Sequence, residues 1–259
     1  MNDKELHKRA LNSLKIRDYP SVELYVNQLL ETKPDDPALY ILLGNSFVKR
    51  KNYAAALQQY QQSLKLDKNN AEAYNNIAVV FKQQGKLPSA VKAAEKAYKL
   101  DPSRADICYN LANFYKLSDK NEKAIDWYRK AIKIDPTFVL AYNNLGNLYE
   151  QTRQHDLAAE LYRKGLATDS NHPVLRYNLG VTLESGENPK AALDEYRQAL
   201  KTRPIWPEGW NNYGVALQKT GRAEDAIRAF KEILKIEPAN SKAKNNLGVI
   251  LTEQGKYPE

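Results

Sequence analysis

The chain has 259 residues, 42% of them hydrophobic and 27% charged, a balance that excludes a disordered chain. No run approaches the roughly 18 apolar residues of a membrane-spanning helix, and the charged N-terminus is not typical of a secretory signal. The net charge is +8, but the excess is concentrated in residues 37–104, whereas nucleic-acid-binding proteins favour a uniformly basic surface. We therefore expect a cytoplasmic protein with no membrane span and no nucleic-acid partner.

A repeat of 34 residues organises the chain from residue 3 to its end. Segments that share an Asn-Asn pair recur in register at residues 71–78, 139–146, 207–214 and 241–248. The period continues without insertion or deletion. It gives seven full repeats and the first half of an eighth, which begin near residues 3, 37, 71, 105, 139, 173, 207 and 241. We expect these repeats to form a single array over residues 1–259.

Each repeat predicts two amphipathic helices joined by a short turn. Position 8 of every repeat is Ala or Gly, and position 20 is Ala except for Val22 in the first repeat. Large residues recur at positions 4, 7 and 11 on the first helix and at position 24 on the second, so each helix has one apolar face. In the third repeat we expect helices over about 71–84 and 88–100, with Gly85 and Pro102 at their ends. Since no segment alternates as a strand does, the fold class is all-α.

Position by position, the repeats resemble the tetratricopeptide repeat (TPR), and the resemblance covers essentially the whole chain. It implies a right-handed α-solenoid, the TPR superhelix of helix-turn-helix repeats, in which the first helices line a concave groove. It also implies a scaffold or adaptor that binds an extended polypeptide segment in this groove, rather than an enzyme. Because no repeat buries its faces alone, neighbouring repeats must stabilise one another.

Asparagine occupies position 6, on the first helix, in six successive repeats. We call this set the asparagine ladder; it comprises Asn76, Asn110, Asn144, Asn178, Asn212 and Asn246. Asn is a mediocre helix former, but its amide has one acceptor and two donors that can hold a peptide group. Further asparagines at position 9, including Asn113 and Asn147, and at position 5 widen the row. The ladder is similar to the one in the TPR superhelix of O-GlcNAc transferases, where it holds an extended polypeptide. The alternative is that these amides bond to the neighbouring repeat or are solvated.

Charged residues give the predicted groove a polarity. Position 12 is Lys82 and Lys116 in the third and fourth repeats but Glu150 and Glu184 in the next two, and Lys49 extends the basic stretch at position 13. We interpret the lysines as a place for an acidic part of the ligand. The alternative is that they are ordinary solvated charges at helix ends.

The sequence carries no arrangement of residues that is typical of catalysis or of metal binding. His7, His155 and His172 fall at unrelated repeat positions, and no cysteine lies near them. Cys108 replaces the large residue of position 4, which indicates a small core residue. We expect no catalytic residue, no metal and no cofactor.

Two further interpretations concern the end of the chain. The residues Lys256–Glu259 stop where a second helix should begin, which leaves Leu247 and Leu251 of the last first helix without their partner. The sequence is then interpreted as a fragment that is truncated at its C-terminus, for example the substrate-docking region of a larger glycosyltransferase similar to O-GlcNAc transferases. Alternatively, the uncapped end lets copies of the chain self-associate.

Overall fold

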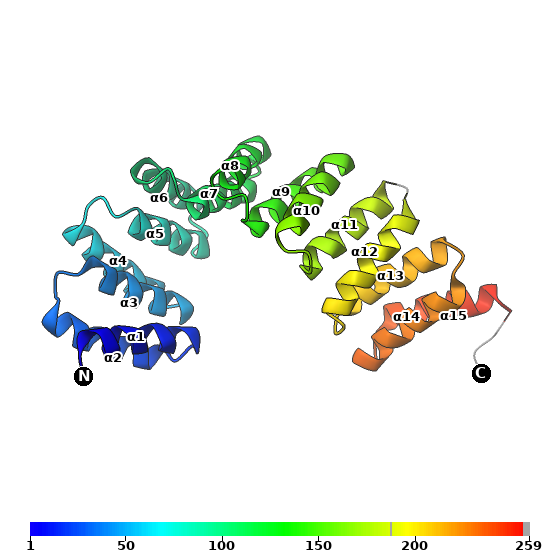
Figure 1. The fold of residues 1–259 in the computed structure, drawn as a ribbon, viewed down its shortest axis with the longest axis horizontal. Coiled ribbons are helices and arrows are strands. Elements are labelled where there is room, and N and C mark those ends of the chain that lie inside the picture. Colours follow the sequence, from blue (N-terminus) through cyan, green and yellow to red (C-terminus); the bar gives the residue numbers. More distant parts are fainter. Residues whose placement is uncertain (187, 256–259) are drawn as a thin grey trace. The chain divides into compact units, whose positions relative to one another are not determined.

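The computed structural model describes residues 1–186 and 188–255, and in this part of the chain it contains fifteen α-helices and no strand (Figure 1). The helices are α1 Asp3–Lys15, α2 Tyr19–Thr32, α3 Pro37–Lys49, α4 Tyr53–Leu66, α5 Ala71–Gln83, α6 Leu87–Leu100, α7 Ala105–Leu117, α8 Asn121–Ile134, α9 Val139–Gln151, α10 His155–Thr168, α11 Pro173–Ser185, α12 Pro189–Thr202, α13 Pro207–Lys219, α14 Ala223–Ile236 and α15 Ser241–Glu253. The prediction of an all-α, helix-pair fold is confirmed. In the third repeat, α5 and α6 match the expected bounds to within one residue.

The turn between the two helices of a repeat places position 15 in the left-handed backbone region. Its φ lies between 55° and 77° in Arg17, Lys51, Gly85, Asp119, Arg153, Gly221 and Gly255. The sequence indicated this turn only where glycine stands, yet four residues with side chains adopt the same conformation at a cost of roughly 1 kcal/mol each. Position 15 of the sixth repeat, residue 187, lies outside the described residues.

The small residues at positions 8 and 20 lie where the two helices of a pair approach each other. A Cβ atom added to Gly146 would lie 2.5 Å from Cε1 of Tyr162, a fully buried ring on the paired helix. Gly180 is similarly close to the ring of Tyr196, at 2.7 Å. In these two repeats glycine at position 8 leaves room for the large ring at position 24, whereas the fourth repeat has Ala112 and Tyr128 at the same positions, both fully buried.

The described residues form two compact units, Met1–Asp135 with α1–α8 and Pro136–Glu259 with α9–α15. Within each unit, every helix packs on the next one along the chain. In the first unit α3 contacts α5 and α5 contacts α7, whereas the even-numbered helices of successive pairs contact each other less. The second unit repeats this arrangement with α9, α11 and α13. One array over 1–259 stays a prediction, and the expected break at 256–259 lies outside the described residues.

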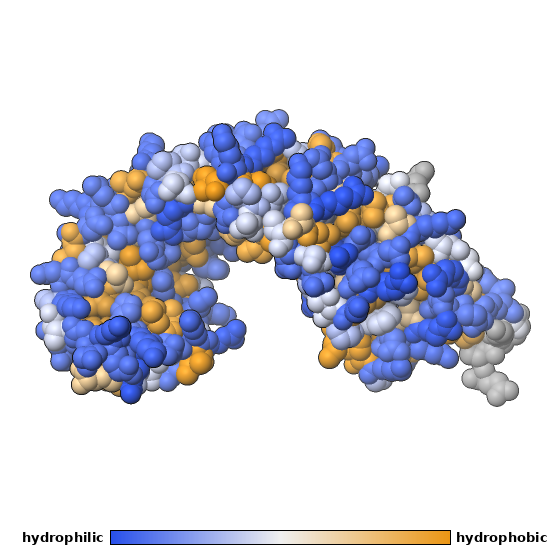
Figure 2. All heavy atoms as spheres, in the orientation of Figure 1, coloured by the Kyte–Doolittle hydropathy of each residue, from blue (hydrophilic) through white to orange (hydrophobic). Residues whose placement is uncertain are grey.

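Each unit therefore has a surface built by its first helices, which we call the odd-helix face of that unit. Within a unit, each even-numbered helix packs against the odd-numbered helices before and after it. Hydrophilic residues cover most of the visible surface of both units, with hydrophobic residues between them (Figure 2). The asparagine ladder lies on these odd-numbered helices.

Candidate functional site

All six members of the asparagine ladder are half-buried on odd-numbered helices. Four of them donate a hydrogen bond from the side-chain amide to the position-5 side chain of the preceding repeat. In the first unit, Nδ2 of Asn110 donates to Oδ1 of Asn75 over 2.9 Å. In the second unit, Asn178 donates to Asn143 over 2.9 Å, Asn212 to the Tyr177 hydroxyl over 2.8 Å and Asn246 to Asn211 over 3.1 Å. The ladder is thus bonded to neighbouring repeats, one of the alternatives that the sequence left open.

Asn76 shows how the local sequence selects the acceptor. The preceding repeat has Ile41 at position 5, which offers no side-chain acceptor. Asn76 donates instead to Oδ1 of Asn45, at position 9 of that repeat, over 3.1 Å. Asn178 uses both kinds of acceptor, because it also donates to Oδ1 of Asn147 over 3.1 Å.

These bonds limit what the ladder can offer a ligand. An Asn amide has only two N–H donors, and Asn178 already uses both within the protein. The expectation that each amide clasps a peptide group from both sides therefore does not fit Asn178. Among the described residues, none donates to the carbonyl oxygen Oδ1 of Asn76, Asn110, Asn178 or Asn246, so these acceptors remain for a ligand.

Asn144 and Asn212 have their carbonyl oxygens engaged within their own helix. Oδ1 of Asn144 accepts from Nδ2 of Asn143 over 3.1 Å, and Oδ1 of Asn212 accepts from Nδ2 of Asn211 over 3.2 Å. In both cases the donor is the adjacent position-5 asparagine. A ligand must therefore share these two oxygens with a protein donor.

The position-9 asparagines accept hydrogen bonds from the buried tyrosines of position 24. The hydroxyl of Tyr128 donates to Asn113 over 2.6 Å, and that of Tyr162 donates to Asn147 over 2.6 Å. Asn45 accepts from its own repeat's tyrosine in the same way. Sequence reasoning missed this pairing, although the constant spacing of 15 residues between the Asn and the Tyr is a usable signal.

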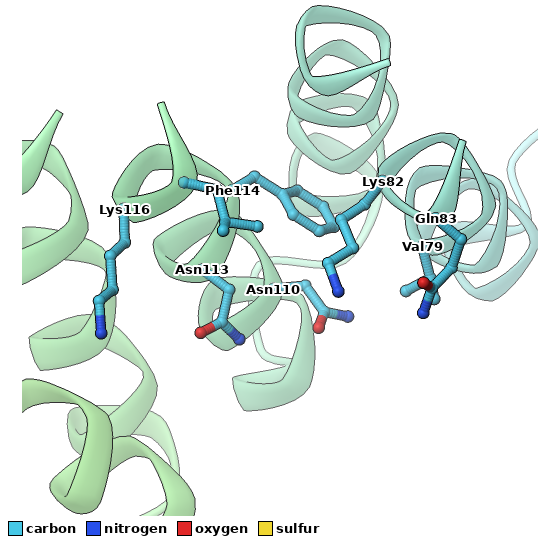
Figure 3. A pocket seen from close by; sticks show the side chains of 8 residues that line it. Val79, Lys82, Gln83, Asn110, Asn113, Phe114 and Lys116 are labelled. Atoms are coloured by element: carbon cyan, nitrogen blue, oxygen red, sulfur yellow. The ribbon is translucent and has the colours of Figure 1, made fainter. Parts of the chain in front are cut away.

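The basic residues of the first unit line cavities on its odd-helix face. A cavity of about 390 Å³ between α5 and α7 is lined by Val79, Lys82, Gln83, Asn110, Asn113, Phe114, Lys116 and Leu117. The polar ends of Lys82, Asn110, Asn113 and Lys116 point to the same side of these helices (Figure 3). A neighbouring cavity of about 290 Å³ includes Lys49, Asn45 and Asn76. The structure thus brings Lys49, Lys82 and Lys116 together with the first two members of the ladder.

The glutamates at position 12 of the second unit have partners within the protein. Oε2 of Glu150 lies 3.0 Å from Nδ1 of His155 and accepts from the Thr182 hydroxyl over 2.9 Å. Glu184 accepts from the Tyr196 hydroxyl over 3.0 Å and from Nζ of Lys219 over 2.6 Å. By contrast, the described residues place no acidic group at ion-pair distance from Lys49, Lys82 or Lys116. The two units therefore differ in both the sign and the availability of their position-12 charges.

The thiol of Cys108 and the imidazole of His172 lie in places that explain them as structural groups. Cys108 is buried, and burial raises the pKa of its thiol to about 11. Nδ1 of His172 accepts from the Leu175 backbone N–H over 3.2 Å at the start of α11. Within the described residues, no three His, Cys, Asp or Glu side chains are grouped as metal ligands. None of the described helices is long and apolar enough to cross a bilayer, and the cytoplasmic location stays a prediction.

Three sequence-family models match the chain. A model described as TPR repeat matches residues 44–85 and 113–152. Two models described as tetratricopeptide repeat match residues 71–104 and 207–240, and residues 143–209. The chain belongs to the tetratricopeptide-repeat family. The matches at 71–104 and 207–240 coincide with two of the repeats read from the sequence, and the predicted family is confirmed.

Several solved structures share the fold. YrrB, described as a TPR protein with an unusual peptide-binding site, is 22% identical, with 72% of this chain and 96% of YrrB covered and a TM-score of 0.60. The pilF protein of Pseudomonas aeruginosa is 19% identical over 81% of this chain and 95% of its own, with a TM-score of 0.70. The C-terminal part of a TPR repeat-containing protein from Cytophaga hutchinsonii is 17% identical over 93% of this chain and 98% of its own, with a TM-score of 0.69. No curated protein sequence matches the chain. These likenesses show the fold alone.

Proposed function

We propose that this TPR protein is a scaffold or adaptor that binds an extended polypeptide segment on its odd-helix faces. The observation that carries the proposal is the set of ladder oxygens on Asn76, Asn110, Asn178 and Asn246. Each of these asparagines is half-buried, its side chain is held by a hydrogen bond from Nδ2 to the preceding repeat, and none of the described residues donates to its Oδ1. Carbonyl acceptors that recur on the odd-helix face of each unit suit the backbone N–H groups of an extended chain.

Family membership and the cavities support the same function. TPR arrays present extended binding surfaces that follow from stacking of the repeats. In the first unit the cavities lie beside the ladder, so a bound backbone has adjacent space for side chains. Backbone contacts supply affinity with little sequence preference, and the cavities then supply the selection.

The test uses changes in the ligand, because substitution of a ladder asparagine also breaks a contact between repeats. Peptides selected from a random displayed library are resynthesised with single backbone esters, which remove one N–H donor and leave the protein unchanged. Affinity is measured by fluorescence anisotropy. With a net contribution of about 1 kcal/mol per hydrogen bond, each ester at a contacted residue weakens binding about fivefold.

The control is the same ester placed in a flanking residue that can be deleted without loss of affinity; this change leaves the affinity unaltered. If esters throughout the essential segment leave the affinity unchanged, the ligand's backbone N–H groups are not recognised and the proposal fails. If the library yields no binding peptide, a linear peptide is the wrong class of ligand.

A further inference from the structure

We infer that the odd-helix face of the first unit binds a segment that carries aliphatic side chains at one end and a run of carboxylates at the other. This inference rests on the proposed function and assigns a ligand chemistry to one part of it. Its basis is a row of adjoining cavities whose lining changes from apolar to basic along the repeats.

The cavities adjoin because they share lining residues. The first, of about 270 Å³, and the second, of about 290 Å³, have Leu14 and Asn45 in common. The second and the third, of about 390 Å³, share Val79. The row therefore runs from α1 and α3 across α5 to α7 within the first unit.

The first cavity is lined on one part by aliphatic residues, Leu11, Leu14, Ile41 and Leu42, which we call the aliphatic end; His7, Asn45 and Glu72 also line it. Leu42 occupies position 6, where the later repeats carry asparagine, and Ile41 occupies position 5, where they carry asparagine or tyrosine, so the polar ladder is absent here. Leu11 is 40% exposed although it is a large hydrophobic residue on this face. An aliphatic ligand side chain placed here removes apolar surface from water, which is the main source of favourable binding energy in such cavities.

The second and third cavities form a basic row, defined by Lys49, Lys82 and Lys116. The described residues that line them include no carboxylate, and none of the three lysines forms an ion pair with a described residue. Lys82 and Lys116 are also half-buried. A cation that is partly removed from water without a counter-charge is unfavourable, and a ligand carboxylate offsets this.

Two comparisons favour an acidic peptide over another polyanion. The rings that line the basic row, Tyr60 and Phe114, are 1% and 2% exposed, so they cannot stack on nucleic-acid bases. The aliphatic end adjoins the basic row, and side chains of a polypeptide supply both kinds of group at once. In the second unit the equivalent position carries Glu150 and Glu184, so the acidic preference belongs to the first unit.

The test measures binding of labelled synthetic peptides to the full chain by fluorescence anisotropy. The parent peptides carry a pair of leucines at one end and a run of glutamates at the other, in both orders along the chain. One comparison peptide replaces the glutamates with glutamines, another replaces the leucines with serines, and a labelled oligonucleotide of similar charge tests for general polyanion binding. We expect one parent order to bind at least about tenfold tighter than each of these probes, and to weaken as salt rises from about 50 mM to about 500 mM.

Protein variants locate the contact. Reversal of the basic row, Lys49→Glu with Lys82→Glu and Lys116→Glu, is expected to weaken the parent peptide at least about tenfold and to leave the glutamine peptide unchanged. The matched control reverses three exposed lysines on even-numbered helices of the same unit, Lys65, Lys92 and Lys99, with the same change in net charge and no expected loss. Leu11→Ser in the protein is expected to abolish the difference in affinity between the leucine peptide and the serine peptide. Circular dichroism confirms that each variant remains helical.

The inference is overturned if the parent peptides bind no tighter than the glutamine peptide, if the oligonucleotide binds tighter than either parent, or if the two lysine variants weaken binding equally. These failures are distinguishable from failure of the proposed function. If the random library yields neutral peptides that are sensitive to backbone esters, the scaffold function stands and only the acidic chemistry assigned to the first unit is wrong.

Discussion

Substitution of Asn178 by alanine tests whether the asparagine ladder holds successive repeats together. The side chain donates to Asn143 over 2.9 Å and to Asn147 over 3.1 Å. Asn147 keeps the hydroxyl of Tyr162 as a donor, whereas the half-buried oxygen of Asn143 loses the donor that the structure gives it. With about 1 kcal/mol net for each bond, and water replacing part of the loss, Asn178→Ala is expected to lower the free energy of unfolding by about 1–2 kcal/mol.

The measurement is urea unfolding followed by far-ultraviolet circular dichroism. Asn245→Ala is the matched control, since Asn245 is exposed and has no hydrogen bond among the described residues; its change is expected to stay within about 0.5 kcal/mol. The double variant Asn143→Ala with Asn178→Ala should cost less than the sum of the single changes, with a coupling of about 1 kcal/mol. Equal stability of Asn178→Ala and Asn245→Ala, or strict additivity of the pair, would refute the structural role.

Three other expectations follow from buried groups. Gly146→Ala places a methyl group 2.5 Å from a fully buried tyrosine ring, so it should lower the free energy of unfolding by about 1–3 kcal/mol, less the gain in helix propensity. Gly248→Ala is the control, because a methyl group there has no neighbour within 4 Å; urea unfolding should show it to be neutral or stabilising. The thiol of Cys108, whose pKa burial raises to about 11, should react with a disulfide reagent only after denaturation, and rapid reaction of the native protein would contradict its burial. Burial raises the pKa of Tyr115 to about 12, whereas a tyrosine in the unfolded chain has a pKa of about 10. The contribution of this group to the free energy of unfolding is therefore fully present below about pH 10 and is lost as the pH rises toward about 12. Thermal midpoints should fall over that window, and midpoints that stay constant would contradict the assignment.

The fold could be predicted from the sequence because the requirement for small residues between paired helices is local and recurs many times along the chain. A small residue at position 8 and one at position 20 recur at fixed spacing, and the structure buries both between paired helices, as Gly146 and Ala158 illustrate. The turns were predicted less completely. Glycine marks position 15 in Gly85, but Lys51 adopts the same left-handed conformation because the surrounding helices impose it. The left-handed conformation at position 15 cannot be predicted from the residue type alone.

The candidate site was predicted less well, because the sequence shows which side chains recur but not which atoms are already bonded. The position-6 asparagines lie half-buried on the odd-helix faces, yet their amides bond to the preceding repeat and, in Asn178, no donor remains. That outcome depends on the identity of residues 31 and 35 positions earlier in the chain. Reading a tandem repeat one position at a time hides such pairs, whereas comparing position 6 with positions 5 and 9 of the preceding repeat reveals them.

The size match between position 8 and position 24 also bears on how such an array can change during evolution. Gly146 pairs with the ring of Tyr162, whereas the buried Ala78 has Ala94 at the equivalent place on its partner helix. A genetic crossover at a repeat boundary transfers both members of a pair and keeps the match. A crossover inside a repeat separates the two members of a pair and can place glycine opposite alanine, which leaves a void, although the fourth repeat accommodates Ala112 and Tyr128 at the same two positions. Duplication and loss of whole 34-residue units should therefore be tolerated far better than exchange of single helices, although every repeat has the same length.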